Sequence, residues 1–190
     1  MNLRYCTLVL AALSSLLCIT SPILGQNLLG KPTSGVFGLK VGVISRMNFD
    51  TNPPLQSEVG SCAQVFADLP QGHEFYLTGA FDFYYIEMNR SNQVMIEASL
   101  GLKRIFPLPR SKMFLKPAVS VGFAYLAQMG DLPASRFLSI KLFVETHFTI
   151  DARKAWVGEL GFFQAPKGSN GKSDVTLGPG LFIRWGLAFR

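Results

Sequence analysis

The feature that most constrains this chain is a strict alternation of side-chain character along residues 137–150. Apart from one threonine, every second residue is a bulky aliphatic or aromatic one, and lysine, glutamate, histidine and serine fall among the residues between them. Such period-2 alternation predicts a β-strand with one apolar face. The apolar face consists of Leu138, Ile140, Leu142, Val144, Thr146, Phe148 and Ile150.

Similar stretches recur along the chain, and we interpret eight of them as strands. Seven have an apolar face that carries charge only near the strand ends. The segment 58–67 alternates poorly and is assigned chiefly because transmembrane barrels close with an even number of strands. Pro117 and Pro179 fall inside predicted strands, where we expect each to mark a bulge or a strand end. The eight segments are residues 36–47, 58–67, 74–87, 93–105, 113–126, 137–150, 155–163 and 175–189.

The first 25 residues have the composition of a cleaved secretion signal. Arg4 precedes an apolar run from Leu8 to Ile19, and Ile23–Gly25 forms a small-residue cleavage site before Gln26. The run is shorter than the ~20 residues of a membrane-spanning helix, which disfavours an uncleaved anchor. We therefore expect a signal peptide at 1–25 and one barrel domain at 26–190.

Composition excludes several classes of function for the mature chain. Removing Arg4 with the signal leaves 17 Lys and Arg against 12 Asp and Glu. The basic residues are spread along the chain, so no nucleic-acid surface is expected. Cys62 alone remains, which excludes an intrachain disulfide and suggests no metal cluster or other cofactor. Cys18 follows the bulky Leu17, which disfavours a lipoprotein.

The composition of the less apolar strand face separates a membrane barrel from a soluble ligand-binding calyx. In a calyx this face meets water and is rich in long polar side chains, whereas here small residues crowd it. Small residues suit the tight interior of an eight-stranded barrel, and they are Gly38, Gly42, Ala80, Ser99, Gly101, Ala118, Ser120, Gly122, Ala124, Gly161, Gly178, Gly180, Gly186 and Ala188. The apolar face has aromatic residues near strand ends, as transmembrane barrels do: Phe75, Tyr85, Tyr125, Trp156 and Trp185. The sequence therefore predicts an all-β, eight-stranded antiparallel up-and-down transmembrane β-barrel with the apolar face toward lipid.

Ten charged residues fall on the predicted inward face. Buried charges must be paired or solvated, and six cations against four anions are nearly balanced. We expect a plug of ion pairs and water, with a cation-lined pore as the alternative. The predicted network consists of Lys40, Arg46, Lys103, Lys116, Lys141 and Arg184 with Asp82, Glu97, Glu145 and Glu159.

The connectors fit an up-and-down order. The short turn-forming segments 106–112 and 151–154 are expected at the periplasmic end, together with both termini. The connectors 51–54, 128–136 and 164–174 are then expected outside, with 89–92 as a short outer loop.

Three side chains resemble parts of a hydrolase triad. Glu145 and His147 share the inward face with Ser139, but Ser139 is eight residues from His147, about 26 Å along a strand. We therefore expect no catalysis. The segment 168–173 ends like a phosphate loop but lacks its first glycine, and it lies in a hairpin loop. His73 and Cys62 offer no further catalytic pattern.

Two stretches resemble bacterial outer-membrane β-barrel domains of the OmpA, OmpX and PorT-like type. Val36–Val43 is similar to the first strand of those domains and Leu177–Phe189 to the last. The resemblance implies export to the outer membrane. It also implies that the barrel-assembly machinery reads a signal formed by Trp185, Leu187 and Phe189, here followed by Arg190.

The sequence indicates location more clearly than activity. We expect a non-catalytic, monomeric outer-membrane protein with a structural or surface-interaction role, in contact with membrane lipid and lipopolysaccharide. A narrow channel for small solutes is the first alternative, and a hydrolase acting on lipid A is the second.

Overall fold

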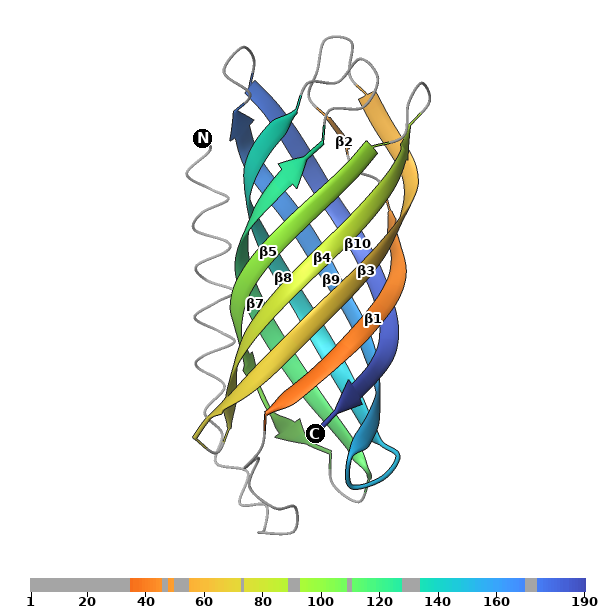
Figure 1. Cartoon of the computed structure of the whole chain (residues 1–190), viewed down its shortest axis with the longest axis vertical. Helices are drawn as coiled ribbons and strands as arrows, with labels where there is room; N and C mark the ends of the chain where they lie inside the picture. The colour runs from red at the N-terminus through yellow and green to blue at the C-terminus, as the bar shows by residue number, and fades with distance from the viewer. Residues whose placement is uncertain are drawn as a thin grey trace. The chain divides into compact units, whose positions relative to one another are not determined.

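The chain forms a closed antiparallel β-barrel in the computed structural model, which describes residues 35–45, 48–49, 55–72, 74–88, 93–108, 111–127, 134–169 and 174–190 (Figure 1). Eight long strands make the wall, and the predicted fold class is confirmed. They are β1 (Val36–Ser45), β3 (Leu55–Gln71), β4 (Phe75–Met88), β5 (Gln93–Arg104), β7 (Met113–Leu126), β8 (Ser135–Thr149), β9 (Lys154–Ser169) and β10 (Asp174–Phe189), with the two-residue strands β2 (Asn48–Phe49) and β6 (Phe106–Pro107). The predicted signal peptide lies outside the described residues. No helix among the described residues is long and apolar enough to cross a membrane.

The first and last long strands close the barrel. Residues 37–45 of β1 pair antiparallel with residues 181–189 of β10, and β1 pairs on its other side with β3. Gly42 lies at this seam, where an added Cβ would collide with the carbonyl oxygen of Ile183. Closure leaves none of the eight long strands, as described, at an open sheet edge.

Short turns gather at the end of the barrel that holds the C-terminus (Figure 1). Gly72, after β3, has a φ of +73°, a conformation that glycine adopts without steric cost. Asp151 accepts hydrogen bonds at Oδ1 from the backbone N–H groups of Arg153 (2.7 Å) and Lys154 (2.9 Å), which fixes the turn between β8 and β9. The turn between β8 and β9 therefore lies at the same end as the C-terminus, as predicted, and the turn at Gly72 lies there as well.

Two predicted segment boundaries were wrong. The poorly alternating segment 58–67 is the middle of β3, a 17-residue strand. Its outward face mixes small and mid-sized residues such as Ala63 and Val65, which explains the weak pattern. β9 continues to Ser169, so most of the predicted connector 164–174 is strand.

The prolines affect pairing in different ways. Pro179 lies at a register shift between β10 and β9, the predicted bulge. Pro117 lies inside β7 with continuous pairing to β8. On its other side it falls between the last β5 pair, Lys103–Ala118, and the β6 pair Phe106–Leu115, so it coincides with a break in the neighbouring strand.

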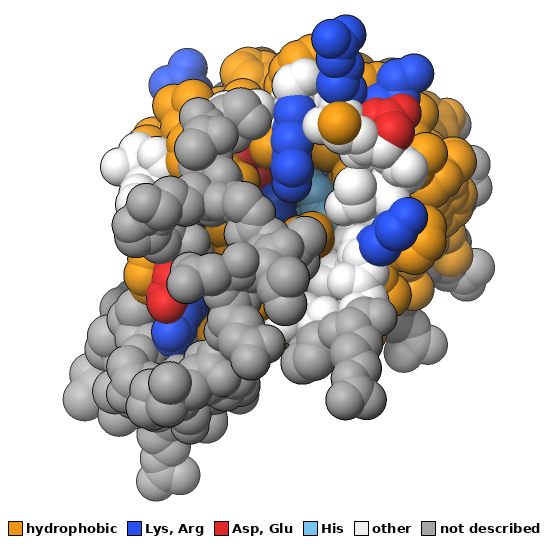
Figure 2. Space-filling model, turned by 90° about the horizontal axis from the view of Figure 1, so that it is seen from below, with side chains coloured by type: hydrophobic (Ala, Val, Ile, Leu, Met, Phe, Trp, Pro, Cys, Tyr) orange, Lys and Arg blue, Asp and Glu red, His pale blue; other side chains and the backbone are white. Residues whose placement is uncertain are grey.

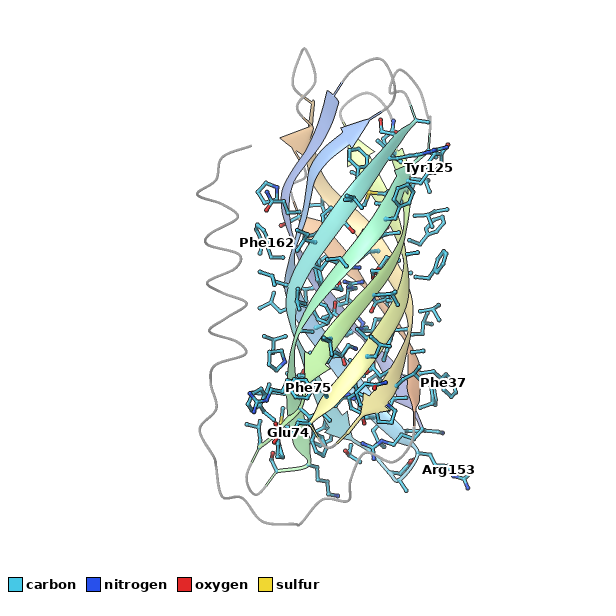
Figure 3. All side chains as sticks on the ribbon, turned by 90° about the vertical axis from the view of Figure 1, so that its left-hand side faces the viewer. Phe37, Glu74, Phe75, Tyr125, Arg153 and Phe162 are labelled. Atoms are coloured by element: carbon cyan, nitrogen blue, oxygen red, sulfur yellow. The ribbon has the colours of Figure 1, made fainter. Side chains whose placement is uncertain are left out.

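Apolar side chains cover the outside of the barrel. Burial alternates residue by residue along β1, and its outward residues are aliphatic or aromatic except for Ser45. Figure 3 shows Phe37, Tyr125 and Phe162 pointing away from the wall. Trp156 and Trp185 are 54% and 53% exposed. A closed barrel with an apolar exterior can span a bilayer, because all its strands are paired and its outer face is apolar. A soluble calyx, by contrast, turns its apolar face inward.

Candidate functional site: the closed lumen

Charged side chains fill the middle of the barrel. Five cations and five anions among the described residues point inward, and His147 joins them. Each is at most 4% exposed, so water hardly reaches them. Seen from below, Figure 2 shows basic side chains and a histidine inside the ring of the wall. The cations are Lys40, Lys103, Lys116, Lys141 and Arg184, and the anions are Asp68, Asp82, Glu97, Glu145 and Glu159.

The lower cluster, nearer the C-terminal end, is centred on Glu145 of β8. Its carboxylate lies 2.6 Å from Lys40 Nζ and 3.0 Å from Lys103 Nζ. Lys103 Nζ also lies 2.9 Å from Asp68 Oδ1, and Lys116 Nζ lies 3.6 Å from Asp68 Oδ2. Each carboxylate of the lower cluster therefore faces two or more ammonium groups.

The upper cluster is centred on Asp82 of β4. Lys141 Nζ lies 2.6 Å from Asp82 Oδ2 and 3.2 Å from Glu97 Oε2, and Arg184 forms a second ion pair with Asp82. Neutral groups complete the set: Gln64 donates to Asp82 (2.9 Å), Tyr84 donates to Glu97 (2.9 Å) and Ser139 donates to Glu97.

Glu159 joins the two clusters. It pairs with Lys40 of the lower cluster, and its Oε1 lies 2.8 Å from Nη2 of Arg184 in the upper one. The charged lumen is thus one connected network. Removing one partner from a buried pair typically costs about 3–5 kcal/mol, because the other charge is left uncompensated.

Aromatic rings lie among the cations. The Phe66 ring centroid is 4.3 Å from Lys40 Nζ and 4.7 Å from Lys103 Nζ, and the Phe182 centroid is 4.2 Å from the Arg184 guanidinium carbon. Such cation–π contacts stabilise charge where water is excluded.

An apolar layer fills the lumen between the upper cluster and the outer end. Its members come from all eight long strands and most are no more than 2% exposed. They include Ile44, Cys62, Tyr84, Ile86, Met95, Ala124, Leu126, Phe137, Phe163 and Phe182. The expectation of a plug of ion pairs and water is therefore incomplete, because apolar side chains fill part of the lumen.

The structure places nine of the ten predicted network residues in the lumen, while Arg46 lies outside the described residues. Sequence reasoning missed Asp68. It lies one residue beyond the predicted segment 58–67, and the alternation of β3 puts it on the inward face with Gln64 and Phe66. With Asp68 included, the described charges balance.

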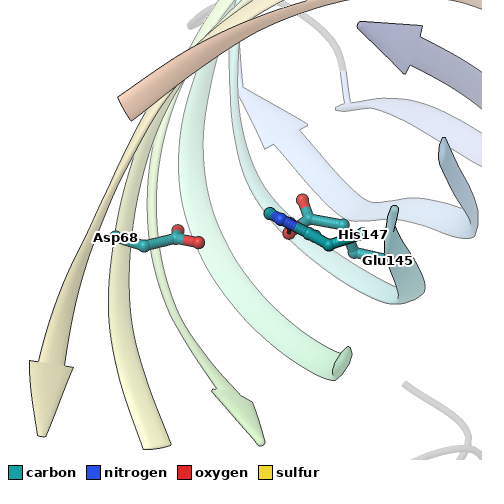
Figure 4. Close-up of side chains that lie close together, drawn as sticks. All are labelled: Asp68, Glu145 and His147. Carbon is teal, nitrogen blue, oxygen red and sulfur yellow. Dashed lines mark hydrogen bonds and ion pairs between the residues drawn. The ribbon is translucent and has the colours of Figure 1, made fainter. Parts of the chain in front are cut away.

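Asp68, Glu145 and His147 are close enough to suggest a metal site (Figure 4). Their ligand atoms lie within 4.8 Å of one another. The two carboxylates, however, already pair with three lysines, Lys40, Lys103 and Lys116. Ammonium groups thus take the position that a metal ion needs.

The triad-like residues do not assemble. His147 Nε2 lies 2.5 Å from Glu145 Oε1, whereas the hydroxyl of Ser139 donates to Glu97. Cys62 is buried in the apolar layer. His73 and residues 170–173 lie outside the described residues.

The predicted assembly residues lie at the closing seam. Trp185 and Leu187 pair with Val41 and Leu39 of β1, and Phe189 pairs with Phe37. Trp185 points outward, as its exposure of 53% shows. Their reading by the assembly machinery stays a prediction.

Comparisons with known proteins agree with this architecture. No protein-family model matches the chain, and no curated protein matches its sequence. The crystal structure of Neisserial surface protein A (NspA) matches with a TM-score of 0.56 at 10% identity, over 82% of this chain and 99% of that one. The outer membrane protein OprG from Pseudomonas aeruginosa matches with a TM-score of 0.58 at 8% identity, over 82% and 95%. The predicted resemblance to small outer-membrane barrels is therefore confirmed for the fold. This fold, together with the apolar exterior, is that of an integral outer-membrane protein.

Proposed function

We propose that this chain is a non-catalytic outer-membrane barrel with a closed lumen and a structural or surface-interaction role. The observation that carries the proposal is the burial of the lumen at successive heights. Glu145 in the lower cluster is 0% exposed, Arg184 in the upper cluster 1%, and Phe163 in the apolar layer 0%. A conducting path needs walls that water reaches.

The channel alternative would have to cross both layers. An ion would break buried pairs such as Lys141–Asp82 and then enter a layer of hydrocarbon side chains. Losing hydration there without a compensating partner is expensive. No contact among the described residues favours this route.

Cys62 provides a direct test because it faces the apolar layer and is the one cysteine of the predicted mature chain. A small, charged, water-soluble thiol reagent should leave Cys62 unmodified in the folded barrel and modify it after unfolding, with peptide mass mapping as the readout. Labelling in the folded state, together with reproducible unit conductance in planar bilayers, would refute the closed lumen.

A non-catalytic role has its own test. His147→Ala leaves Glu145 paired with Lys40 and Lys103, so the barrel should still fold. The acylation pattern of lipid A from cells that express this variant should match that of cells with the unaltered chain. A pattern that depends on His147 would favour the hydrolase.

A further inference from the structure

A trough crosses the outer wall of the barrel. Its floor consists of Ala67, Gly79 and Ala98, outward-facing small residues on β3, β4 and β5. Large apolar side chains on both flanks form its rims: Phe37, Val65, Phe81, Leu100, Phe123 and Leu138. Small residues on three adjacent strands leave a hollow in an otherwise bulky surface.

Among the described residues, Gly79 has no neighbour so close that it requires a glycine. A Cβ added to it would meet nothing nearer than Leu100 Cδ2 at 3.7 Å, whereas at Gly101 or Gly161 it would collide with neighbouring atoms. Glycine in a strand interior weakens the strand and often marks a close approach by a ligand. Gly79 therefore leaves space on the outer wall in which a ligand can lie close to the backbone.

The exposure of the surrounding side chains supports the same conclusion. Among the described large apolar residues that are exposed, the six most exposed all line the trough. They are Leu138 (67%), Leu100 (63%), Phe81 (61%), Phe37 (60%), Val121 (60%) and Val65 (59%). These side chains lie beside space that no described part of the chain fills.

Charge distinguishes the two ends of the trough. At the end remote from the C-terminus, Phe123 and Leu138 pair across β7 and β8, and the next outward pair is Tyr125 with Arg136. Arg136 is exposed and makes no ion pair within the described part of the chain. A guanidinium in this position is suited to a phosphate or carboxylate in the headgroup layer.

The opposite end of the trough is bordered by an aromatic pair. Phe37 stacks on Phe189 with ring centroids 5.6 Å apart, which separates the floor from Lys154, the nearest outward cation along that row of pairs. Arg104 of β5 is already paired with Glu74 at 3.0 Å. Arg136, next to the outer end of the floor, is therefore the described cation best placed to pair with a headgroup.

We infer that the trough binds one acyl chain of a phosphorylated glycolipid of the outer leaflet, a lipopolysaccharide, whose phosphate pairs with Arg136. This inference rests on the proposed membrane placement. The acyl chain follows the floor from Ala98 toward Gly79 and fills the space above the glycine. The lipid would cover the most exposed apolar side chains of the barrel.

The test is native mass spectrometry of the purified full barrel in detergent, titrated with purified lipopolysaccharide. Gly79→Phe fills the trough, and Arg136→Gln removes the charge. Leu160→Phe, on the opposite wall, and Arg153→Gln, in an exposed turn, are the matched controls. We expect each trough variant to lower the affinity for the first bound lipid roughly tenfold, about the loss of one charge-assisted hydrogen bond or a few buried methylenes.

Four outcomes would overturn the inference. They are equal binding by all variants, an equal loss in the controls, displacement of lipopolysaccharide by a phospholipid without dependence on Arg136, and a protein dimer that Gly79→Phe dissociates. A heat-dependent shift in electrophoretic mobility, measured on every variant, shows whether the barrel is closed. Failure of the barrel itself is thereby distinguished from failure of the lipid site.

Discussion

Phe37 in the first strand and Phe189 in the last stack across the seam that closes the barrel, with ring centroids 5.6 Å apart and planes inclined by 27°. The contact lies on the lipid side, beside the C-terminus. Phe189 belongs to the predicted assembly signal in the last strand, and its aromatic ring also completes the wall of the barrel. Loss of Phe189 should therefore affect both assembly and closure.

Deletion of Phe189 and Arg190 tests the C-terminal signal. The truncated chain loses the aromatic pair and the end of the β1–β10 ladder, so its yield in the outer membrane should fall severalfold. Deleting Arg190 alone is the control and should have little effect. Unchanged yield from the longer deletion would remove the basis for this assembly signal.

Glu159→Gln tests whether the lumen is one connected network. The substitution leaves Lys40 and Arg184 without their shared anion, and unfolding in urea should show a loss of about 3–5 kcal/mol. Glu74→Gln, which breaks the partly exposed pair with Arg104, should cost at most about 1 kcal/mol. Equal losses from the two substitutions would mean that the lumen pairs contribute no more than surface ones.

Leu142→Arg tests the lipid face near the middle of β8. A cation at the bilayer midplane costs about 2–4 kcal/mol in barrels of this kind, so insertion into vesicles should be strongly reduced. Leu142→Met keeps the face apolar and is the matched control. Normal insertion of the arginine variant would argue that this face does not meet lipid.

The period-2 pattern was sufficient to predict the fold, because successive side chains of a strand point to opposite faces of the sheet. The apolar residues therefore identify one face and the polar or small residues the other. In β8 the pattern placed Lys141, Glu145 and His147 inward, and the structure agrees. The alternation is harder to recognise in β3, because outward residues such as Ala63 and Ala67 are too small to contrast with the inward ones.

Two features of the site could not be predicted from single strands. Alternation predicts that Glu159 faces the lumen but not its position along the barrel axis. Its contacts with Lys40 and Arg184 therefore depend on the stagger among β1, β9 and β10. The apolar layer has the same origin: Phe137, Phe163 and Phe182 come from three strands and meet only after the barrel closes. The trough also depends on the register that brings Ala67 beside Gly79.

Tryptophan fluorescence tests whether the apolar face of the barrel meets lipid while the charges lie inside. The chain has two tryptophans, and the structure exposes Trp156 and Trp185 on the outer wall. In the vesicle-reconstituted barrel, lipids that carry a quencher near the headgroup should quench both, and aqueous iodide should quench little. A water-soluble chain whose tryptophans are shielded from lipid quenchers would show that the apolar face does not meet lipid.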